Sequence, residues 1–319
     1  MQNVNERIAV LVPCYNEETT VAEVAAEFRS VIPQADIYVY DNNSSDATVE
    51  RAKAAGAIVR YVKSQGKGFV VQQMFREIDA DIYVMVDGDS TYPAGEVWNL
   101  IEPVLAGEAD MAVGSRLMAE SDSDFKRLNR FGNKVFLRAV NYIFKVRLTD
   151  ILSGYRVFNR TFVKNIPIFG GGFEIETELT IKSLARNYRI VERPVKLVPR
   201  PESSNSKISI VRDGLLISNM IFSLFRDYKP LTFFGLIGLV LIVLGLIPGA
   251  LVIYEFLETG IVARLPSAVL SVGLELAGML SVTVGVVLHT ITRRSRETEH
   301  LMHALYDEIE RIKFENQAP

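Results

Sequence analysis

The C-terminal third of the chain contains an uninterrupted apolar run, because residues 231–254 include no charged side chain. A second apolar stretch, residues 267–291, is interrupted only by Glu275 and His289. At a helical rise of 1.5 Å per residue, the first run extends about 36 Å, which exceeds the roughly 30 Å hydrocarbon thickness of a bilayer. We therefore predict two transmembrane helices. The alternative, a pair of buried core helices, is disfavoured because core helices rarely stay uncharged over this length.

Basic residues are distributed unevenly around these two stretches. Residues 226–229 contain two basic side chains and residues 293–296 contain three, whereas the connector 255–266 holds only Arg264. The positive-inside rule then places both flanks in the cytoplasm and the connector outside. We expect a multi-pass integral membrane protein of a bacterial inner or plasma membrane, with a cytoplasmic catalytic domain.

Residues 1–206 alternate short apolar runs with amphipathic stretches, a pattern typical of βαβ units. The expected strands are 8–12, 37–40, 58–61, 81–87 and 111–114, and the expected helices are 20–31, 48–55, 68–78 and 96–106. This pattern predicts a doubly wound α/β sheet, whose ligands gather outside the carboxyl ends of its strands. Cys14 is the only cysteine, so no intrachain disulfide can form.

Three further segments surround the membrane stretches. Residues 125–147 contain seven basic and no acidic residues, which suits an anionic membrane surface, although a solvated helix face is the alternative. Residues 207–229 are expected to form a juxtamembrane amphipathic helix or a linker packed on the catalytic domain. The hairpin then occupies residues 230–292. Residues 293–319 are expected to form a cytoplasmic amphipathic helix whose apolar stripe suits packing in an oligomer.

A carboxylate pair follows the apolar run at 82–86. Asp87 and Asp89 lie two positions apart in an extended segment, so both can face one hard cation, while Gly88 lets a substrate approach the backbone. Taken alone, such a triplet also fits a solvated turn.

Acidic residues also follow the first two expected strands, at Glu17 and Asp41. These acids also have a purely structural explanation. An acid such as Glu17 in a first helical turn complements the helix dipole, and Asp46, in the loop after Asp41, could cap the following helix. Three acidic loops at one sheet edge nevertheless predict a nucleoside pocket.

Six segments, in this order, resemble family 2 glycosyltransferases of the GT-A fold. The similarity is strongest to polyprenyl-phosphate glycosyltransferases akin to dolichyl-phosphate mannose synthase and bacterial GtrB-type enzymes. The segments are PCYNEE (13–18), DNNSSDAT (41–48), GKG (66–68), DGD (87–89), VGSR (113–116) and DILSGYR (150–156). The resemblance implies a GT-A (Rossmann-like) domain that transfers one sugar, with inversion, from a nucleotide sugar to undecaprenyl or dolichyl phosphate. A UDP-hexose or UDP-HexNAc is favoured as donor, and GDP-mannose remains open.

The resemblance also implies roles for individual residues on the donor side. The nucleotide would be bound by Pro13, Tyr15, Glu17, Asp41, Asn43, Lys67, Asp87 and Gly88. Asp87 and Asp89 would hold Mg²⁺ or Mn²⁺ on the diphosphate, and Asp89 would thereby act in catalysis. A metal that neutralises the leaving diphosphate removes the need for an acid at that oxygen.

A lipid phosphate is largely a dianion at neutral pH, so it needs cationic positioning rather than a strong base. The candidate cations are Arg116, Arg156 and Lys207, although either arginine could instead pair with Asp150 or another acid. In related glycosyltransferases an acceptor-side acid falls at the positions of two further residues, which could instead lie on an exposed helix face. These are Glu174 and Glu176.

Two other functions remain open. One is transfer to the hydroxyl of a diacylglycerol-type lipid, and the other is a catalytically inactive, nucleotide-sugar-binding membrane scaffold. The absence of a Gln-x-x-Arg-Trp motif argues against processive polysaccharide synthesis. We expect a lipid bilayer and a second copy of the chain as partners, and no nucleic acid. A carboxylate such as Glu275 is costly inside an apolar span, so we expect either a helix–helix contact or a role in oligomer contacts or lipid passage.

Overall fold

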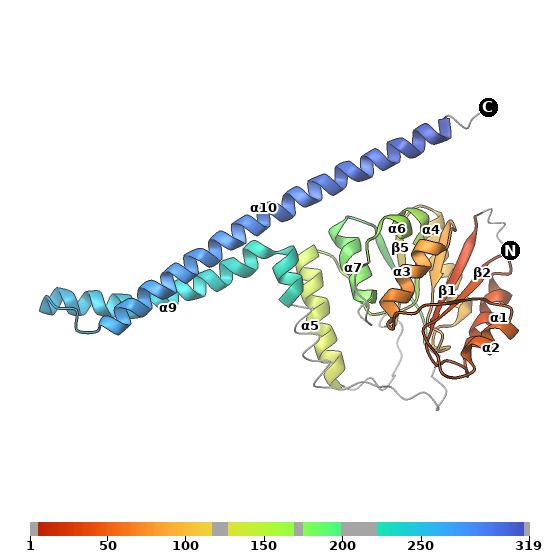
Figure 1. The fold of residues 1–319 in the computed structure, drawn as a ribbon, viewed down its shortest axis with the longest axis horizontal. Coiled ribbons are helices and arrows are strands. Elements are labelled where there is room, and N and C mark those ends of the chain that lie inside the picture. The colour runs from red at the N-terminus through yellow and green to blue at the C-terminus, as the bar shows by residue number, and fades with distance from the viewer. Residues whose placement is uncertain (1–5, 117–126, 169–174, 199–221, 316–319) are drawn as a thin grey trace. The chain divides into compact units, whose positions relative to one another are not determined.

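The computed structural model describes residues 6–116, 127–168, 175–198 and 222–315. By its internal contacts the chain forms two units, Met1–Ile210 and Val211–Pro319 (Figure 1). Expectations for Glu174, for Lys207 and for most of the segment 207–229 lie outside the described residues.

The first unit is built on a seven-stranded sheet in the order β3-β2-β1-β4-β6-β5-β7. The strands are β1 (Ile8–Cys14), β2 (Asp36–Asp41), β3 (Ile58–Tyr61), β4 (Ile82–Met85), β5 (Met111–Ser115), β6 (Arg156–Asn159) and β7 (Ile190–Pro194). Neighbouring strands are parallel except at β6, which is antiparallel to both β4 and β5. The sheet is therefore mixed, and the expectation of a doubly wound sheet missed β6 and β7.

Helices cover both faces of this sheet (Figure 1). The helices of this unit are α1 (Val21–Val31), α2 (Thr48–Ala54), α3 (Lys67–Glu77), α4 (Val97–Leu105), α5 (Arg127–Phe144), α6 (Arg160–Asn165) and α7 (Ile175–Ala185), with the 3₁₀ turn η1 (Ala94–Glu96). Helix α5 packs on α7. Side chains alternate along β1, so Val10 and Val12 pack with Phe28 of α1 in one core. Leu11 packs in a second core with Met74 of α3. Burial on both faces leaves only the ends of the strands for polar chemistry.

Helix α5 occupies most of the expected basic segment 125–147. Among its described side chains, Phe136, Val140 and Ile143 are buried, whereas Lys134 and Arg138 are exposed. The helix is therefore amphipathic, with basic residues on its solvent-facing side.

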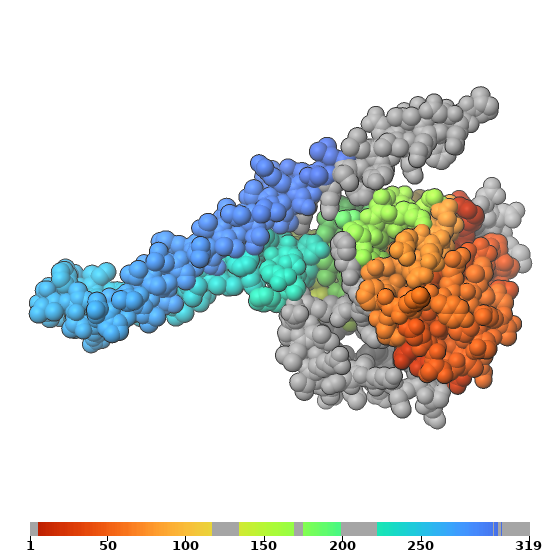
Figure 2. Space-filling view, in the orientation of Figure 1, coloured from red at the N-terminus to blue at the C-terminus, as the bar shows by residue number. Residues whose placement is uncertain are grey.

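The second unit contains the long apolar helices α9 (Pro230–Thr259) and α10 (Leu265–Glu315). Only 17% of the most apolar window of each is buried, and the space-filling view shows them as a slender, largely uncovered pair (Figure 2). A core helix would be mostly covered, so this exposure indicates membrane association. Helix α10 runs without a break to Glu315, because no helix-breaking residue follows its apolar stretch. The tail is therefore not the separate helix that the sequence predicted.

Small residues allow α9 and α10 to pack closely. A Cβ added at Gly278 would lie 2.8 Å from the carbonyl oxygen of Gly238. Ser271 Oγ also donates a hydrogen bond to the carbonyl of Gly245 at 2.7 Å. Close backbone approach through small residues and interhelical hydrogen bonds is how apolar helices associate in lipid. The chain leaves α9 through Gly260, whose φ of 70° suits glycine.

Candidate functional site

The carboxyl ends of β1, β2 and β4 meet at one edge of the sheet. Cys14, at the end of β1, lies in register with Asp41 at the end of β2. A Cβ added at Gly88, after β4, would lie 2.7 Å from Cys14 Sγ. The three acidic loops therefore lie side by side, as the sequence pattern predicts. Because β6 is antiparallel to β4, the loop that precedes it, residues 150–155, reaches the same edge.

Lys67, the first residue of α3, lies between two carboxylates at this edge. Its Nζ donates to Asp87 Oδ1 at 2.5 Å and also to Glu176 Oε1. Burial alone would lower the pKa of Lys67, but the charges of the two carboxylates outweigh it and raise that pKa above its ordinary value. The charged ammonium thus ties the end of β4 to the first turn of α7, where the helix dipole also favours the carboxylate of Glu176.

The triplet 87–89 is held on several sides by the protein. Asp87 Oδ2 lies against Gly154, where a Cβ would overlap it. The carbonyl of Gly88 accepts a hydrogen bond from Thr20 Oγ1 at 2.6 Å. Asp89 is only 6% exposed, and its Oδ1 accepts bonds from the backbone and hydroxyl of Thr91 at 3.1 and 2.6 Å. Gly88 and Asp89 are therefore buried and the side chain of Asp87 is 27% exposed, so the triplet is a largely buried turn and not the fully solvated turn that its composition also permitted.

Asn42 organises the loop that leads into α3. Its Nδ2 donates to the carbonyls of Val62 and Ser64 at 3.2 and 2.8 Å, and its Oδ1 accepts from Gly66 N at 2.7 Å. The loop therefore carries Lys67 at a fixed place beside the acidic edge. Sequence reasoning missed Asn42, whose uncharged side chain was not singled out in a motif rich in Asp and Ser.

The remaining expected nucleotide residues surround the ends of β1 and β2. Pro13 and Glu17 are half-buried, and the side chain of Tyr15 is exposed. Asp41 is buried and accepts a bond from Ser44 N at 3.3 Å. Asn43 has a left-handed φ of 65°. These residues form one continuous polar border along the first two strands.

Asp46 lies one residue before Ala47, the N-cap of α2, so it is not the cap itself but still binds the start of that helix. Its carboxylate accepts a bond from Thr48 N at 3.0 Å, at the start of α2, and another from Glu18 N at 3.2 Å. Burial would raise the pKa of Asp46, but these hydrogen bonds outweigh it and lower the pKa. Asp46 therefore joins the first two loops to each other.

The two arginines expected as phosphate ligands are both engaged by the protein. Arg116 Nε and Nη2 donate to the two oxygens of Asp150 at 2.7 and 3.0 Å, the ion pair that the sequence left as an alternative. Arg156 is fully buried and donates to the carbonyls of Ile151 and Ser153 at 2.9 and 2.8 Å. Burial lowers its pKa to about 10. Its guanidinium therefore holds the loop 150–155 from inside and does not reach the crevice surface.

Glu192 of β7 supports the same loop from the other side. It accepts bonds from Thr149 N at 2.8 Å and from Asp150 N at 2.8 Å. Burial raises the pKa of Glu192. Sequence reasoning missed this residue because β7 was not predicted.

The carboxylates at this edge fit a hard divalent cation only if other ligands complete its coordination shell. Among the residues that the structure describes, no group of three or more His, Cys, Asp or Glu side chains could hold a metal by itself. Mg²⁺ is usually bound through one or two carboxylates, with phosphates and waters completing its shell. Asp87 and Asp89, two positions apart in the turn after β4, would supply those two carboxylates.

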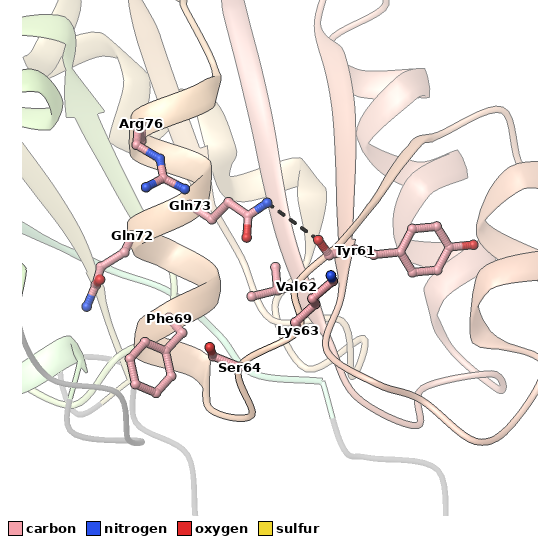
Figure 3. A pocket seen from close by; sticks show the side chains of 8 residues that line it. All are labelled: Tyr61, Val62, Lys63, Ser64, Phe69, Gln72, Gln73 and Arg76. Atoms are coloured by element: carbon pink, nitrogen blue, oxygen red, sulfur yellow. Dashed lines mark hydrogen bonds between the residues drawn. The ribbon is translucent and has the colours of Figure 1, made fainter.

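A cavity of about 410 Å³ lies beside the β3–α3 loop, apart from the carboxylates (Figure 3). In Figure 3, Gln73 and Arg76 come from α3, and the loop supplies Lys63 and Ser64. Gln73 Nε2 donates to the carbonyl of Tyr61 at 3.4 Å. Neither Asp87 nor Asp89 lines this cavity.

Comparison with known proteins identifies the family. Residues 9–166 match the model described as glycosyl transferase family 2. Glycosyltransferase AglJ of Haloferax volcanii is 32% identical over 293 residues, which cover 92% of this chain and 96% of AglJ. A dolichyl-phosphate hexose transferase of the same organism is 27% identical, with 67% of this chain and 92% of that protein covered.

A solved structure shows the same fold. Glucosyl-3-phosphoglycerate synthase from Mycobacterium tuberculosis, in complex with Mg²⁺ and uridine diphosphate, superposes with a TM-score of 0.58 at 22% identity. The match covers 70% of this chain and 80% of the synthase. Together with the sequence motifs, these likenesses show that the chain is a glycosyltransferase with a GT-A-like domain and belongs to glycosyl transferase family 2.

Proposed function

We propose that the protein transfers a single sugar, with inversion, from a nucleotide sugar to a polyprenyl phosphate at the cytoplasmic face of a bacterial inner or plasma membrane. The observation that carries the proposal is the position of Asp87 and Asp89. Both carboxylates lie at a sheet edge bordered by two further acidic loops, in a chain that also carries an apolar helical hairpin. The name of the Haloferax volcanii relative, a dolichyl-phosphate hexose transferase, supports the same acceptor class.

On the donor side, Asp87 and Asp89 would hold Mg²⁺ or Mn²⁺, and the metal would supply charge neutralisation for the leaving diphosphate. The mycobacterial synthase was crystallised with Mg²⁺ and uridine diphosphate, which supports a divalent metal and favours a UDP-sugar over GDP-mannose. The polar border from Pro13 to Asn43 would receive the nucleoside. Lys67 would contact the diphosphate from the start of α3, where helix N–H groups also favour anions.

On the acceptor side, the hairpin would keep the catalytic domain at the interface where the lipid phosphate lies. This arrangement replaces a three-dimensional search with a two-dimensional one and raises the local acceptor concentration. The exposed basic residues of α5 would add attraction to anionic headgroups. Arg116 fits the acceptor phosphate better than the buried Arg156, because 20% of the Arg116 side chain is exposed. We also propose that the protein forms a homo-oligomer, and light scattering in detergent, which measures the mass of the particle, tests this.

The test is a panel of UDP- and GDP-sugars scored by release of nucleoside diphosphate from the full-length protein in detergent, with undecaprenyl phosphate and Mg²⁺. We expect one donor to be consumed and EDTA to abolish its consumption. Asp89→Ala should reduce the rate at least 100-fold, whereas Asp36→Ala should not. Asp36 is a matched control because it is exposed at the opposite end of β2.

Each competing function predicts a different result in this assay. Release with diacylglycerol but not with undecaprenyl phosphate would favour the lipid-hydroxyl acceptor. In that case Glu176→Gln should abolish turnover, since a hydroxyl needs a base. No release with any donor and either acceptor would favour the inactive scaffold.

A further inference from the structure

The ammonium of Lys67 contacts the same carboxylate that the proposed function assigns to the metal. Lys67 Nζ lies 2.5 Å from Asp87 Oδ1, and the other oxygen of Asp87 faces the backbone of Gly154. A divalent cation that approaches Asp87 is therefore repelled by the ammonium already bound there. In a partly buried site this repulsion is strong, because the screening by water is reduced.

The charges around Lys67 favour replacement of its ammonium by a divalent cation over permanent exclusion of that cation. Asp87 and Glu176 share the ammonium of Lys67 as their common partner, so two carboxylate charges lose that partner when the ammonium leaves. Those two charges match a divalent cation. The lysine side chain is 13% exposed and that of Glu176 only 8%, so neither charge is well solvated when its partner is removed.

The backbone around Lys67 allows its side chain to move without unfolding the loop. Gly66 is fixed by the Asn42 carboxamide at 2.7 Å, and α3 begins at Lys67 itself. Four rotatable carbons separate the ammonium from this anchored backbone, so it can swing from Asp87 toward an arriving diphosphate while α3 stays in place.

We infer that Lys67 is an internal competitor of the metal, bound to Asp87 and Glu176 in the nucleotide-free protein and displaced to the diphosphate when the metal and nucleotide enter together. The inference rests on the proposed function. It makes metal binding depend on the nucleotide, because only a diphosphate offers the ammonium a new partner. The same exchange releases the carboxylate of Glu176 on the acceptor side of the site.

The test measures Mn²⁺ binding to the detergent-purified full-length protein by electron paramagnetic resonance, with and without UDP, and with GDP in parallel. The wild type should bind Mn²⁺ weakly alone and at least tenfold more tightly with the nucleotide. Lys67→Met, which keeps the length and removes the charge, should bind Mn²⁺ alone at least tenfold more tightly than the wild type. It should also lose most of the gain from the nucleotide.

Two further variants sharpen the result. Glu176→Gln leaves Lys67 with Asp87 as its remaining charged partner, so Mn²⁺ should bind more weakly without nucleotide, the opposite direction to Lys67→Met. Lys63→Met removes an exposed lysine from the same loop (Figure 3) and should leave Mn²⁺ binding unchanged. Glu176→Gln also serves if Lys67→Met fails to fold, because the two substitutions alter the same contact from opposite sides.

The outcomes separate this inference from the proposed function. If the wild type binds Mn²⁺ with nucleotide but Lys67→Met binds Mn²⁺ alone no more tightly than the wild type, Lys67 is only a structural tie and the inference is wrong. Unchanged Mn²⁺ binding in Glu176→Gln would overturn it as well. If the wild type binds no Mn²⁺ even with a nucleotide, the metal-dependent function itself fails.

Discussion

Gly154 and Asp87 fit together so closely that position 154 admits no side chain. A Cβ at Gly154 would overlap Asp87 Oδ2 and would lie 2.8 Å from its Cγ. Gly154 N also donates a hydrogen bond to the hydroxyl of Tyr92 at 3.1 Å, which fixes the backbone at this point. The loop before the antiparallel strand β6 thus sets the orientation of a carboxylate that follows β4.

Gly154→Ala is therefore expected to displace the Asp87 carboxylate and lower turnover at least tenfold. Overpacking of this kind costs about 1–3 kcal/mol, so the fold should survive. Gly95→Ala is the control, because a Cβ there meets nothing within 4 Å. The measurements are nucleoside diphosphate release and thermal unfolding in detergent. Equal turnover in both variants would show that the position of Asp87 does not matter.

Asn42→Ala should weaken binding of the nucleotide sugar. The substitution leaves Gly66 N and the carbonyls of Val62 and Ser64 without their present partner. An unsatisfied buried polar group costs about 1–3 kcal/mol, so the loop that presents Lys67 should loosen. We expect KM for the donor to rise at least tenfold, with a smaller change in kcat. Steady-state kinetics measure this split, and a fall in kcat alone would contradict it.

A matched control for this loop variant is Asn99→Ala. Asn99 donates a single exposed hydrogen bond to Glu96 and lies away from the acidic edge. Its removal should leave both kinetic constants unchanged.

The sequence patterns predicted the parts of the site that depend on strand order. The five strands foreseen from apolar runs all exist. Strands β1, β4 and β5 are buried on both faces and must therefore be apolar, whereas the edge strand β3 is mostly exposed. Strand β6 escaped prediction because its four residues begin with a charged one, Arg156, and end with a polar one, Asn159, so they form no apolar run. That arginine also illustrates the limit for the site, since the sequence reveals its charge but not its burial. The contact between Lys67 and Glu176, 109 positions apart, follows only from the tertiary fold.

The carboxylate of Asp110 should stabilise the fold at neutral pH and lose this effect in acid. It accepts bonds from Arg189 N at 2.8 Å and from Asn159 Nδ2 at 3.0 Å, and so joins β5 to β6 and β7. Burial would raise the pKa of Asp110, but these bonds outweigh it and hold the pKa below its ordinary value. A depressed carboxyl pKa stabilises the fold above the unfolded value of about 3.9, and this stabilisation is lost as the pH falls below it.

Asp110→Asn should therefore unfold at a lower temperature than the wild type at pH 6, and the difference should narrow between about pH 5 and 3. Thermal unfolding in detergent across this range measures it. Asp36→Asn is the control, since Asp36 is exposed at the start of β2. If the difference in unfolding temperature between the wild type and Asp110→Asn stayed constant with pH, protonation of Asp110 would not be coupled to unfolding.

Cysteine labelling should reveal the orientation of the hairpin. Cys14 is the only cysteine and is 3% exposed, so the wild type offers little background. Ile261→Cys places a thiol in the exposed connector, and Glu297→Cys places one on α10 beyond the apolar span. The positive-inside rule predicts that a membrane-impermeant maleimide labels Ile261→Cys in intact bacterial cells, and Glu297→Cys only after permeabilisation. The reverse pattern would put the catalytic domain outside the cytoplasm, where nucleotide sugars are not made. Labelling of both variants only after permeabilisation would mean that the hairpin does not cross the membrane.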